Sequence, residues 1–253
     1  MLQPVRAEGS KPPFFIVHGL HGVMPLVQPL RRIIDRDRPI YALHARGIDS
    51  SRPPPERMED LLGDYLTEIR AARPRGPYIV GGICAGGLVA MELARNLRLQ
   101  GEKVGTAVLV DPPLIPFYQI PGNRTLNPKE DPRLHQHLYK NVEQILREFV
   151  HRFGELPFEA SVPAKFSHAV ELGIAMVVIF GRYVPPPFEG PTEFIISADR
   201  AFGHFHPEGP WKKIVAKPGR FHVVPCGHNE LFYDHLDQVL RLTEFALDSA
   251  FEA

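Results

Sequence analysis

Three residues of this sequence, Cys84, Asp111 and His228, have the types and surroundings that nucleophilic catalysis requires. Cys84 lies in the segment GICAGG, between an apolar run at 78–80 and a helix-like segment at 88–94. Small flanking residues permit the sharp strand-to-helix reversal of a nucleophile elbow, which strains the central residue. The helix that follows directs free amides and its positive dipole end at the thiol, which favours the reactive thiolate. We therefore expect Cys84 to be a nucleophile, although G-x-C-x-G is a short pattern and a buried cysteine is more often a small, inert hydrophobic residue.

Asp111 and His228 are the candidate partners of this thiol. Asp111 follows the apolar run 106–110 and precedes two prolines, which is typical of the end of a buried parallel strand. His228 follows the strand-like segment 221–224 and the turn residue Gly227. The chain order nucleophile, acid, histidine is that of the α/β-hydrolases. The sequence thus predicts a Cys84, His228 and Asp111 triad at one edge of a sheet.

The acid of this triad has a rival in the sequence. An aspartate after a strand is commonly only a turn residue or a helix cap. Asp199 ends the strand-like segment 193–197, which is another place where α/β-hydrolases carry the acid. Other histidines, such as His204 and His206, have no acidic or cysteine companions at metal-ligand spacing, so we expect no metal site.

An oxyanion hole is expected from two backbone amides. Residues 14–20 indicate a buried strand that runs into a glycine-containing loop. In hydrolases of this class such a loop donates one amide, here that of Leu20, and the residue after the nucleophile, here Ala85, donates the other. His18 and His21 are interpreted as residues that shape this loop rather than as catalysts.

Length and composition fit one α/β domain over residues 1–253, with 44% hydrophobic residues. No apolar run is long enough to cross a membrane, and no secretion signal is visible. Two cysteines give no disulfide framework, so we expect a reducing cytoplasm. A formal net charge of +0 argues against a nucleic-acid partner.

Alternating strand and helix patterns predict a mostly parallel sheet flanked by helices. The helix at 57–72 has apolar residues at helical spacing, Tyr65 among them, which indicates a core face. Residues 113–190 interrupt the alternation as a helical lid insertion, with helices at 135–153 and 163–183 whose apolar faces either pack together or line an acyl channel. The remaining expected strands are 14–17, 39–43, 77–81, 105–110, 192–197 and 220–224, and the remaining helices are 24–35, 85–100 and 231–249.

Several stretches resemble the thioesterase domains of nonribosomal peptide and polyketide synthases. They are residues 2–15, 76–82, 108–111, Trp211 and 226–228. The resemblance implies an α/β-hydrolase fold, an acyl substrate on the phosphopantetheine arm of an acyl or peptidyl carrier protein, and no further cofactor. It also implies Asp111 rather than Asp199 as the acid. Most relatives have serine at the position of Cys84, so a cysteine departs from the family pattern.

Two other functions remain open from the sequence. Dienelactone hydrolases also have cysteine in a G-x-C-x-G-G elbow, but they lack a long lid and the lead-in at 76–78. A catalytically inactive module that only binds a carrier is the third possibility. The sequence is compatible with release of the acyl group by hydrolysis, by cyclisation or by transfer. It is also compatible with either a domain of a larger synthase or a separate protein.

Overall fold

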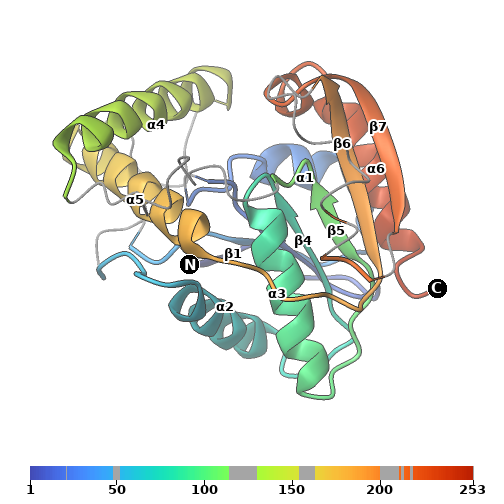
Figure 1. The fold of residues 1–253 in the computed structure, drawn as a ribbon. Helices are drawn as coiled ribbons and strands as arrows, with labels where there is room; N and C mark the ends of the chain where they lie inside the picture. Colours follow the sequence, from blue (N-terminus) through green and yellow to red (C-terminus); the bar gives the residue numbers. More distant parts are fainter. Residues whose placement is uncertain are drawn as a thin grey trace.

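The computed structural model describes residues 1–20, 22–47, 52–113, 130–153, 163–199, 211, 214–216 and 219–252, with part of the side chains of 134–166 and that of Asp199 excepted. Within these ranges it has the predicted α/β architecture, with helices on both faces of one sheet (Figure 1). His21, His204 and His206 lie outside the described residues.

The sheet has seven strands in the order β1-β3-β2-β4-β5-β6-β7. All neighbouring pairs are parallel except β1 and β3, which are antiparallel at one edge. The parallel strands therefore all end at the same edge of the sheet. The strands are β1 (Leu2–Arg6), β2 (Phe14–Val17), β3 (Ile40–Leu43), β4 (Ile79–Ile83), β5 (Ala107–Val110), β6 (Thr192–Asp199) and β7 (Arg220–Gly227).

Alternate side chains of the central strands enter two separate cores. Phe15 and Val17 of β2 belong to one buried cluster, and Phe14 and Ile16 belong to the other. Helices α2 (Met58–Ala72), α3 (Gly86–Leu99) and α5 (Pro163–Arg182) cover the first face, whereas α1 (Val27–Ile33) and α6 (Leu236–Asp248) cover the second. Strands buried on both faces explain the continuous apolar runs in the sequence.

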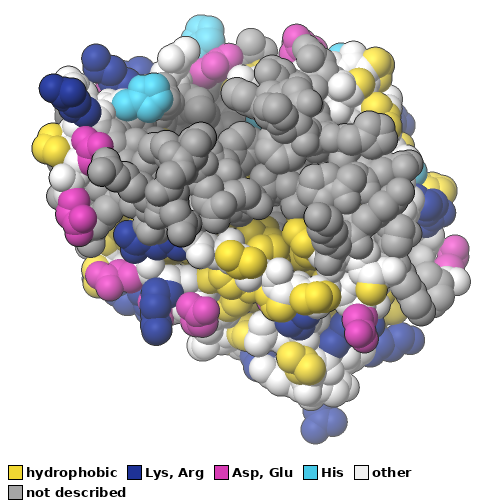
Figure 2. Space-filling model, in the orientation of Figure 1, with side chains coloured by type: hydrophobic (Ala, Val, Ile, Leu, Met, Phe, Trp, Pro, Cys, Tyr) yellow, Lys and Arg dark blue, Asp and Glu magenta, His cyan; other side chains and the backbone are white. Residues whose placement is uncertain are grey.

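The insertion between β5 and β6 contains α4 (Pro132–Phe153) and α5, which pack on each other. Leu172, Met176 and Phe180 of α5 lie in the first core, so this face of the helix packs on the body of the domain. Helix α4 lies outside α5 in Figure 1. In the same orientation, hydrophobic side chains gather in the middle of the surface and most charged ones lie toward its rim (Figure 2). Among the described helices, none is both long and apolar enough to cross a membrane.

Two elements differ from the sequence-based expectation. Strand β1 was not predicted, because its five residues include an exposed proline and only Val5 is buried. The helix expected at 231–249 is divided into a short 3-10 turn (η2, Glu230–Phe232) and α6. The Glu230 carboxylate accepts a hydrogen bond from the Gly227 amide (2.9 Å), which ties the turn to β7 before the chain enters α6.

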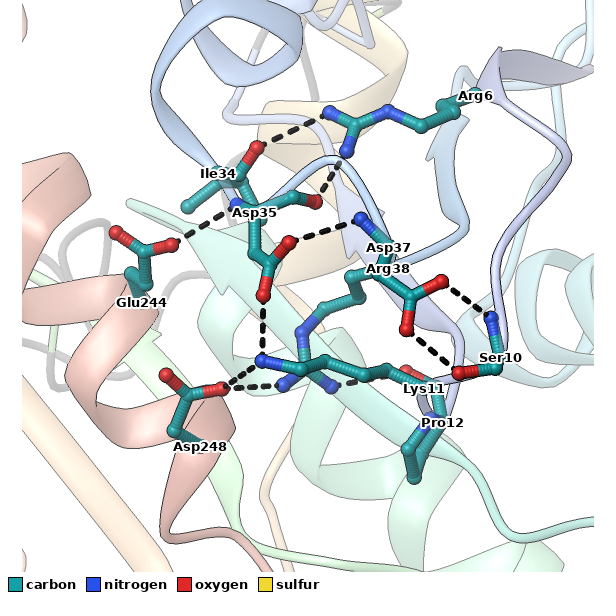
Figure 3. Close-up of polar contacts among 10 residues, drawn as sticks. All are labelled: Arg6, Ser10, Lys11, Pro12, Ile34, Asp35, Asp37, Arg38, Glu244 and Asp248. Atoms are coloured by element: carbon teal, nitrogen blue, oxygen red, sulfur yellow. Dashed lines mark hydrogen bonds and ion pairs between the residues drawn. The ribbon is translucent and has the colours of Figure 1, made fainter.

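A polar network joins the opposite end of the sheet to α6 (Figure 3). The Arg38 side chain is only 2% exposed and donates to the Pro12 carbonyl (2.9 Å) and the Asp248 carboxylate (2.8 Å). Lys11 pairs with Asp35 (2.5 Å) and with Asp248 (3.1 Å). The network thus fixes the entries to β2 and β3 against the last turn of α6.

Candidate active site

Cys84 adopts the strained conformation expected of a nucleophile elbow. It follows β4 directly and has a φ of 49°, in the left-handed region that non-glycine residues rarely occupy. Its amide donates to the Val110 carbonyl (2.8 Å), and its carbonyl accepts from the Gly87 amide (2.9 Å). The strain is therefore held by hydrogen bonds on both sides of the residue.

Close backbone packing explains the glycines around Cys84. A Cβ atom on Gly82 would lie 2.1 Å from the Gly86 carbonyl oxygen, and one on Gly86 would lie 2.0 Å from the His18 carbonyl oxygen. Neither position has room for a side chain. The first turn of α3 consequently packs directly on the end of β2, which brings the elbow beside the loop that follows that strand.

Asp111 is the second non-glycine residue with a left-handed backbone, with a φ of 45°. It follows β5 and is 7% exposed. Its carboxylate accepts hydrogen bonds from the Ser197 amide (2.8 Å) and from the Ser197 hydroxyl (2.9 Å to Oδ2). Ser197 is not predicted as a site residue, because a serine inside a strand has no local signal that marks a distant carboxylate as its partner.

His228 is hydrogen-bonded to Asp111 and lies near Cys84. Its Nδ1 is 2.6 Å from Asp111 Oδ2, and the imidazole also interacts with the Cys84 thiol. The ring meets Phe232 edge to face at 5.3 Å, while the side chain remains 41% exposed. Burial disfavours the imidazolium, but Cys84 and the Asp111 carboxylate outweigh it and raise the pKa of His228 to about 10. The His228 imidazole is therefore protonated at neutral pH.

The rival acid Asp199 is the last residue of β6, and its backbone pairs with Gly227 of β7. Its side chain lies outside the described residues. Among the described side chains, the imidazole of His228 contacts the carboxylate of Asp111.

The two predicted oxyanion donors lie in the elbow itself and in the loop after β2. Ala85 directly precedes α3 and is buried, and Leu20 follows β2. A Cβ atom on Gly19 would lie 3.7 Å from Cys84 Cβ, so the β2 loop is in contact with the nucleophile. In the described part of the chain, the amides of Leu20 and Ala85 donate no hydrogen bond to another backbone group.

The point where the insertion rejoins the domain is fixed on α3. Arg95 donates to the Pro186 carbonyl (2.7 Å) and to the carbonyl of Pro187, and it pairs with the buried Glu92 (3.0 Å). Tyr183 lies near the same Glu92, and burial together with this carboxylate raises the pKa of the Tyr183 phenol. The end of α5 is consequently anchored to the helix that begins at the elbow.

No group of three metal-ligating side chains occurs among the described residues.

The sheet order and the residues at its strand ends place this protein among the α/β-hydrolases. The match to a family model assigns the chain to one family within that fold. The family model described as thioesterase domain matches residues 12–246, so the chain belongs to the thioesterase domain family, whose members hydrolyse thioester bonds.

Two similar proteins are a synthase and a synthetase by name. The dimodular nonribosomal peptide synthase of Bacillus subtilis (strain 168) is 40% identical over 111 residues, which are 44% of this chain and 5% of that protein. Malpinin synthetase of Mortierella alpina is 37% identical over 113 residues, which are 45% of this chain and 2% of that protein. The chain thus spans a small part of the length of these relatives.

Solved structures agree on the fold. The NocB thioesterase domain from the nocardicin cluster is 19% identical, with a TM-score of 0.71 and coverage of 98% of each chain. The type II thioesterase BorB from the borrelidin cluster is 18% identical, with a TM-score of 0.72 and coverage of 97% of each chain. At these identities the likeness shows the α/β-hydrolase fold.

Proposed function

We propose that this domain releases acyl or peptidyl groups from the phosphopantetheine arm of a carrier protein through a covalent intermediate on Cys84. The observation that carries this proposal is the hydrogen bond of the His228 imidazole to Asp111 (2.6 Å), together with the nearby Cys84 that raises the pKa of the same imidazole. Nucleophile, base and orienting acid in such contact are the requirement for covalent acyl transfer. Membership in the thioesterase family supports the thioester as the bond that is cleaved.

In the first step the Cys84 thiolate attacks the carbonyl carbon of the bound thioester. The carbonyl oxygen becomes an oxyanion that the amides of Leu20 and Ala85 stabilise. The carbon–sulfur bond to the carrier arm then breaks, and the departing sulfur takes the proton from the His228 imidazolium. An acyl-Cys84 thioester, a carrier thiol and a neutral imidazole result. The Asp111 carboxylate holds His228 in the tautomer that this proton transfer needs.

In the second step a nucleophile attacks the acyl-Cys84 carbonyl while His228 removes its proton. Water gives a free acid and restores the thiolate and imidazolium pair. Because the intermediate is itself a thioester, it stays activated toward an amine or an internal hydroxyl as well, which would give a transferred or cyclic product. The helical insertion follows β5 at the same edge of the sheet, and we assign to it the role of a lid that selects the acyl chain.

The carrier domain is the partner that this proposal requires. The relatives are nonribosomal peptide synthases and related synthetases by name, and this chain matches a small part of each of them. A domain of that kind receives its substrate from a neighbouring carrier rather than from a free pool. No further cofactor is needed for either step.

Intact-mass spectrometry with simple acyl thioesters tests the proposal. Wild type should gain the mass of one acyl group, Cys84→Ala should gain none, and Cys226→Ala should behave as wild type. Cys226 is the matched control because it is the other cysteine, is 5% exposed and packs in the core on the α6 side of the sheet. The fate of the released acyl group then identifies hydrolysis, cyclisation or transfer.

Two outcomes would contradict the proposal. Alkylation of Cys84 without any acyl adduct, together with turnover of lactones, would favour a hydrolase similar to the dienelactone hydrolases. Absence of both alkylation and acylation would indicate an inactive module that binds a carrier.

A further inference from the structure

A fully buried pair of side chains lies beneath the loop that carries the Leu20 amide. His18 follows β2, and Tyr65 comes from the middle of α2; both are 0% exposed. His18 Nε2 is 2.5 Å from the Tyr65 hydroxyl oxygen, and His18 Nδ1 is 2.5 Å from the Gly19 carbonyl oxygen. Two consecutive hydrogen bonds, from Tyr65 to His18 and from His18 to Gly19, thus connect α2 to the residue before Leu20.

The direction of these hydrogen bonds follows from their acceptors. A carbonyl oxygen can only accept, so Nδ1 of His18 carries the proton and donates to Gly19. Burial lowers the pKa of His18 to about 4, and the imidazole is neutral with Nε2 as an acceptor. Burial also raises the pKa of Tyr65 well above its usual value, so its hydroxyl keeps the proton that it donates to Nε2.

Holding the Gly19 carbonyl also orients the Leu20 amide. The two groups belong to one planar, trans peptide unit, in which the C=O and N–H bonds point in opposite directions. The Gly19 carbonyl accepts a second hydrogen bond from the Gly22 amide (3.3 Å). Without these restraints a glycine peptide rotates readily, and a rotated unit would present its carbonyl oxygen to the site in place of its N–H.

We propose that Tyr65 and His18 are positioning residues for the oxyanion hole, which act by locking the Gly19–Leu20 peptide with its N–H directed at the substrate oxygen. Neither side chain touches the reacting atoms. The inference rests on the proposed function, because it assigns a donor role to Leu20. Gly19 lies against Cys84, where a Cβ on Gly19 would be 3.7 Å from Cys84 Cβ, so the locked peptide is adjacent to the nucleophile.

Two reactions of the same thiol separate positioning from general structural support. Acylation by a simple thioester develops an oxyanion, whereas alkylation by iodoacetamide displaces iodide from a saturated carbon and develops none. Tyr65→Phe removes the hydroxyl that fixes the His18 tautomer. We expect its acylation rate to fall about 10- to 100-fold, less than the full loss of one oxyanion donor, while its alkylation rate stays near that of wild type.

Tyr78→Phe is the matched control. Tyr78 is also 0% exposed, and its hydroxyl donates to a backbone carbonyl, that of Arg73 (2.7 Å), at the entry to β4 and not at its Cys84 end. This variant loses a buried hydrogen bond of similar kind but should leave the ratio of acylation to alkylation unchanged. If wild type is acylated and the two variants have the same ratio of acylation rate to alkylation rate, the positioning role of Tyr65 is wrong but the proposed function stands. No acylation of wild type would overturn the proposed function and this inference with it.

Substitutions at His18 give a second, independent test. The side-chain amide of His18→Asn can still donate from the Nδ1 position to Gly19, whereas His18→Leu cannot. We expect the asparagine variant to retain much more acylation than the leucine variant. Adding Tyr65→Phe to His18→Asn should then have little further effect, because the tautomer that Tyr65 fixes is no longer present. Equal loss in both His18 variants, or additive loss in the double variant, would contradict the proposal.

Discussion

The two ends of the parallel strands carry polar groups of opposite character. At the entry end, where the parallel strands begin, Arg38 and Lys11 form ion pairs with the carboxylates of Asp35 and Asp248 (Figure 3). Hydrogen bonding to Asp35 raises the pKa of Lys11, and the Asp37 amide with Lys11 lowers the pKa of Asp35. No described non-glycine residue of this end has a positive φ.

At the exit end, both Cys84 and Asp111 have left-handed backbones, and the pKa values of His228 and His18 are shifted in opposite directions. The pKa of His228 is raised to about 10, while that of the buried His18 is lowered to about 4. Strained backbone conformations and strongly shifted pKa values persist only where the surrounding structure enforces them. Both are enriched at functional sites. The end where the parallel strands begin therefore stabilises the fold, whereas the end where they finish carries the candidate active site.

Asp111→Asn should give the largest effect. An amide cannot hold His228 in the required tautomer or stabilise its imidazolium, and comparable changes in catalytic triads cost about 1,000- to 10,000-fold in turnover. We expect a loss of that size in thioester hydrolysis, measured under steady-state conditions. Asp199→Asn should retain most of the activity. The reverse result, an active Asp111→Asn and an inactive Asp199→Asn, would assign the acid to the end of β6.

Gly86→Ala should damage both the fold and the site. The new Cβ would lie 2.0 Å from the His18 carbonyl oxygen, a backbone atom that cannot rotate away. Overpacking of this kind costs up to about 3 kcal/mol of unfolding free energy, and the forced shift of His18 would also move the Leu20 loop. Urea denaturation and the acylation rate of Cys84 measure the two effects. Unchanged values of both would show that α3 does not pack on β2 as closely as described.

The sequence predicted the parts of the site that depend on local backbone chemistry. The glycines around Cys84 indicated the elbow, and the apolar run followed by Asp111 and two prolines indicated a strand end. The contacts of Ser197 with Asp111 and of Tyr65 with His18 join residues far apart in the sequence, so no local pattern marks them. Tyr65 was correctly predicted to face the core, but its apolar spacing conceals the hydroxyl that contacts His18. The network of Figure 3 is similarly invisible, because it assembles only when β2, β3 and α6 are in place.

The titration of His228 should depend on Cys84. The folded pKa of about 10 lies above the ordinary value of 6.5, so the protonated imidazole stabilises the native state fully below pH 6.5. That stabilisation is lost as the pH rises through about 10. Cys84→Ala removes a raising partner, and the pKa should fall toward the ordinary value. NMR titration of the His228 ring and urea denaturation against pH both follow the change. An unchanged midpoint would mean that Asp111 alone sets the pKa.

Asp248→Asn should affect stability but not catalysis. Arg38 and Lys11 would lose a charged acceptor, although Arg38 keeps the Pro12 carbonyl and Lys11 keeps Asp35. Because Asp248 is half exposed, we expect a loss of about 1–2 kcal/mol in unfolding free energy. Thioester hydrolysis should stay close to that of wild type in the assay used for Asp111→Asn. A fall in activity as large as that of Asp111→Asn would show that the two ends of the sheet are energetically coupled.

Gly63→Ala should have the smallest effect and the opposite sign to Gly86→Ala. Gly63 lies inside α2, and a Cβ built on it meets no atom within 4 Å. Alanine restricts the unfolded chain and favours a helix interior, so we expect a gain of about 0.5–1 kcal/mol in unfolding free energy. Acylation of Cys84 should not change, because the substitution lies on the open side of the helix that presents Tyr65 to the core. Destabilisation would mean that α2 is held in a conformation that only glycine permits, and the contrast between glycines that the site needs and glycines that the scaffold merely tolerates would fail.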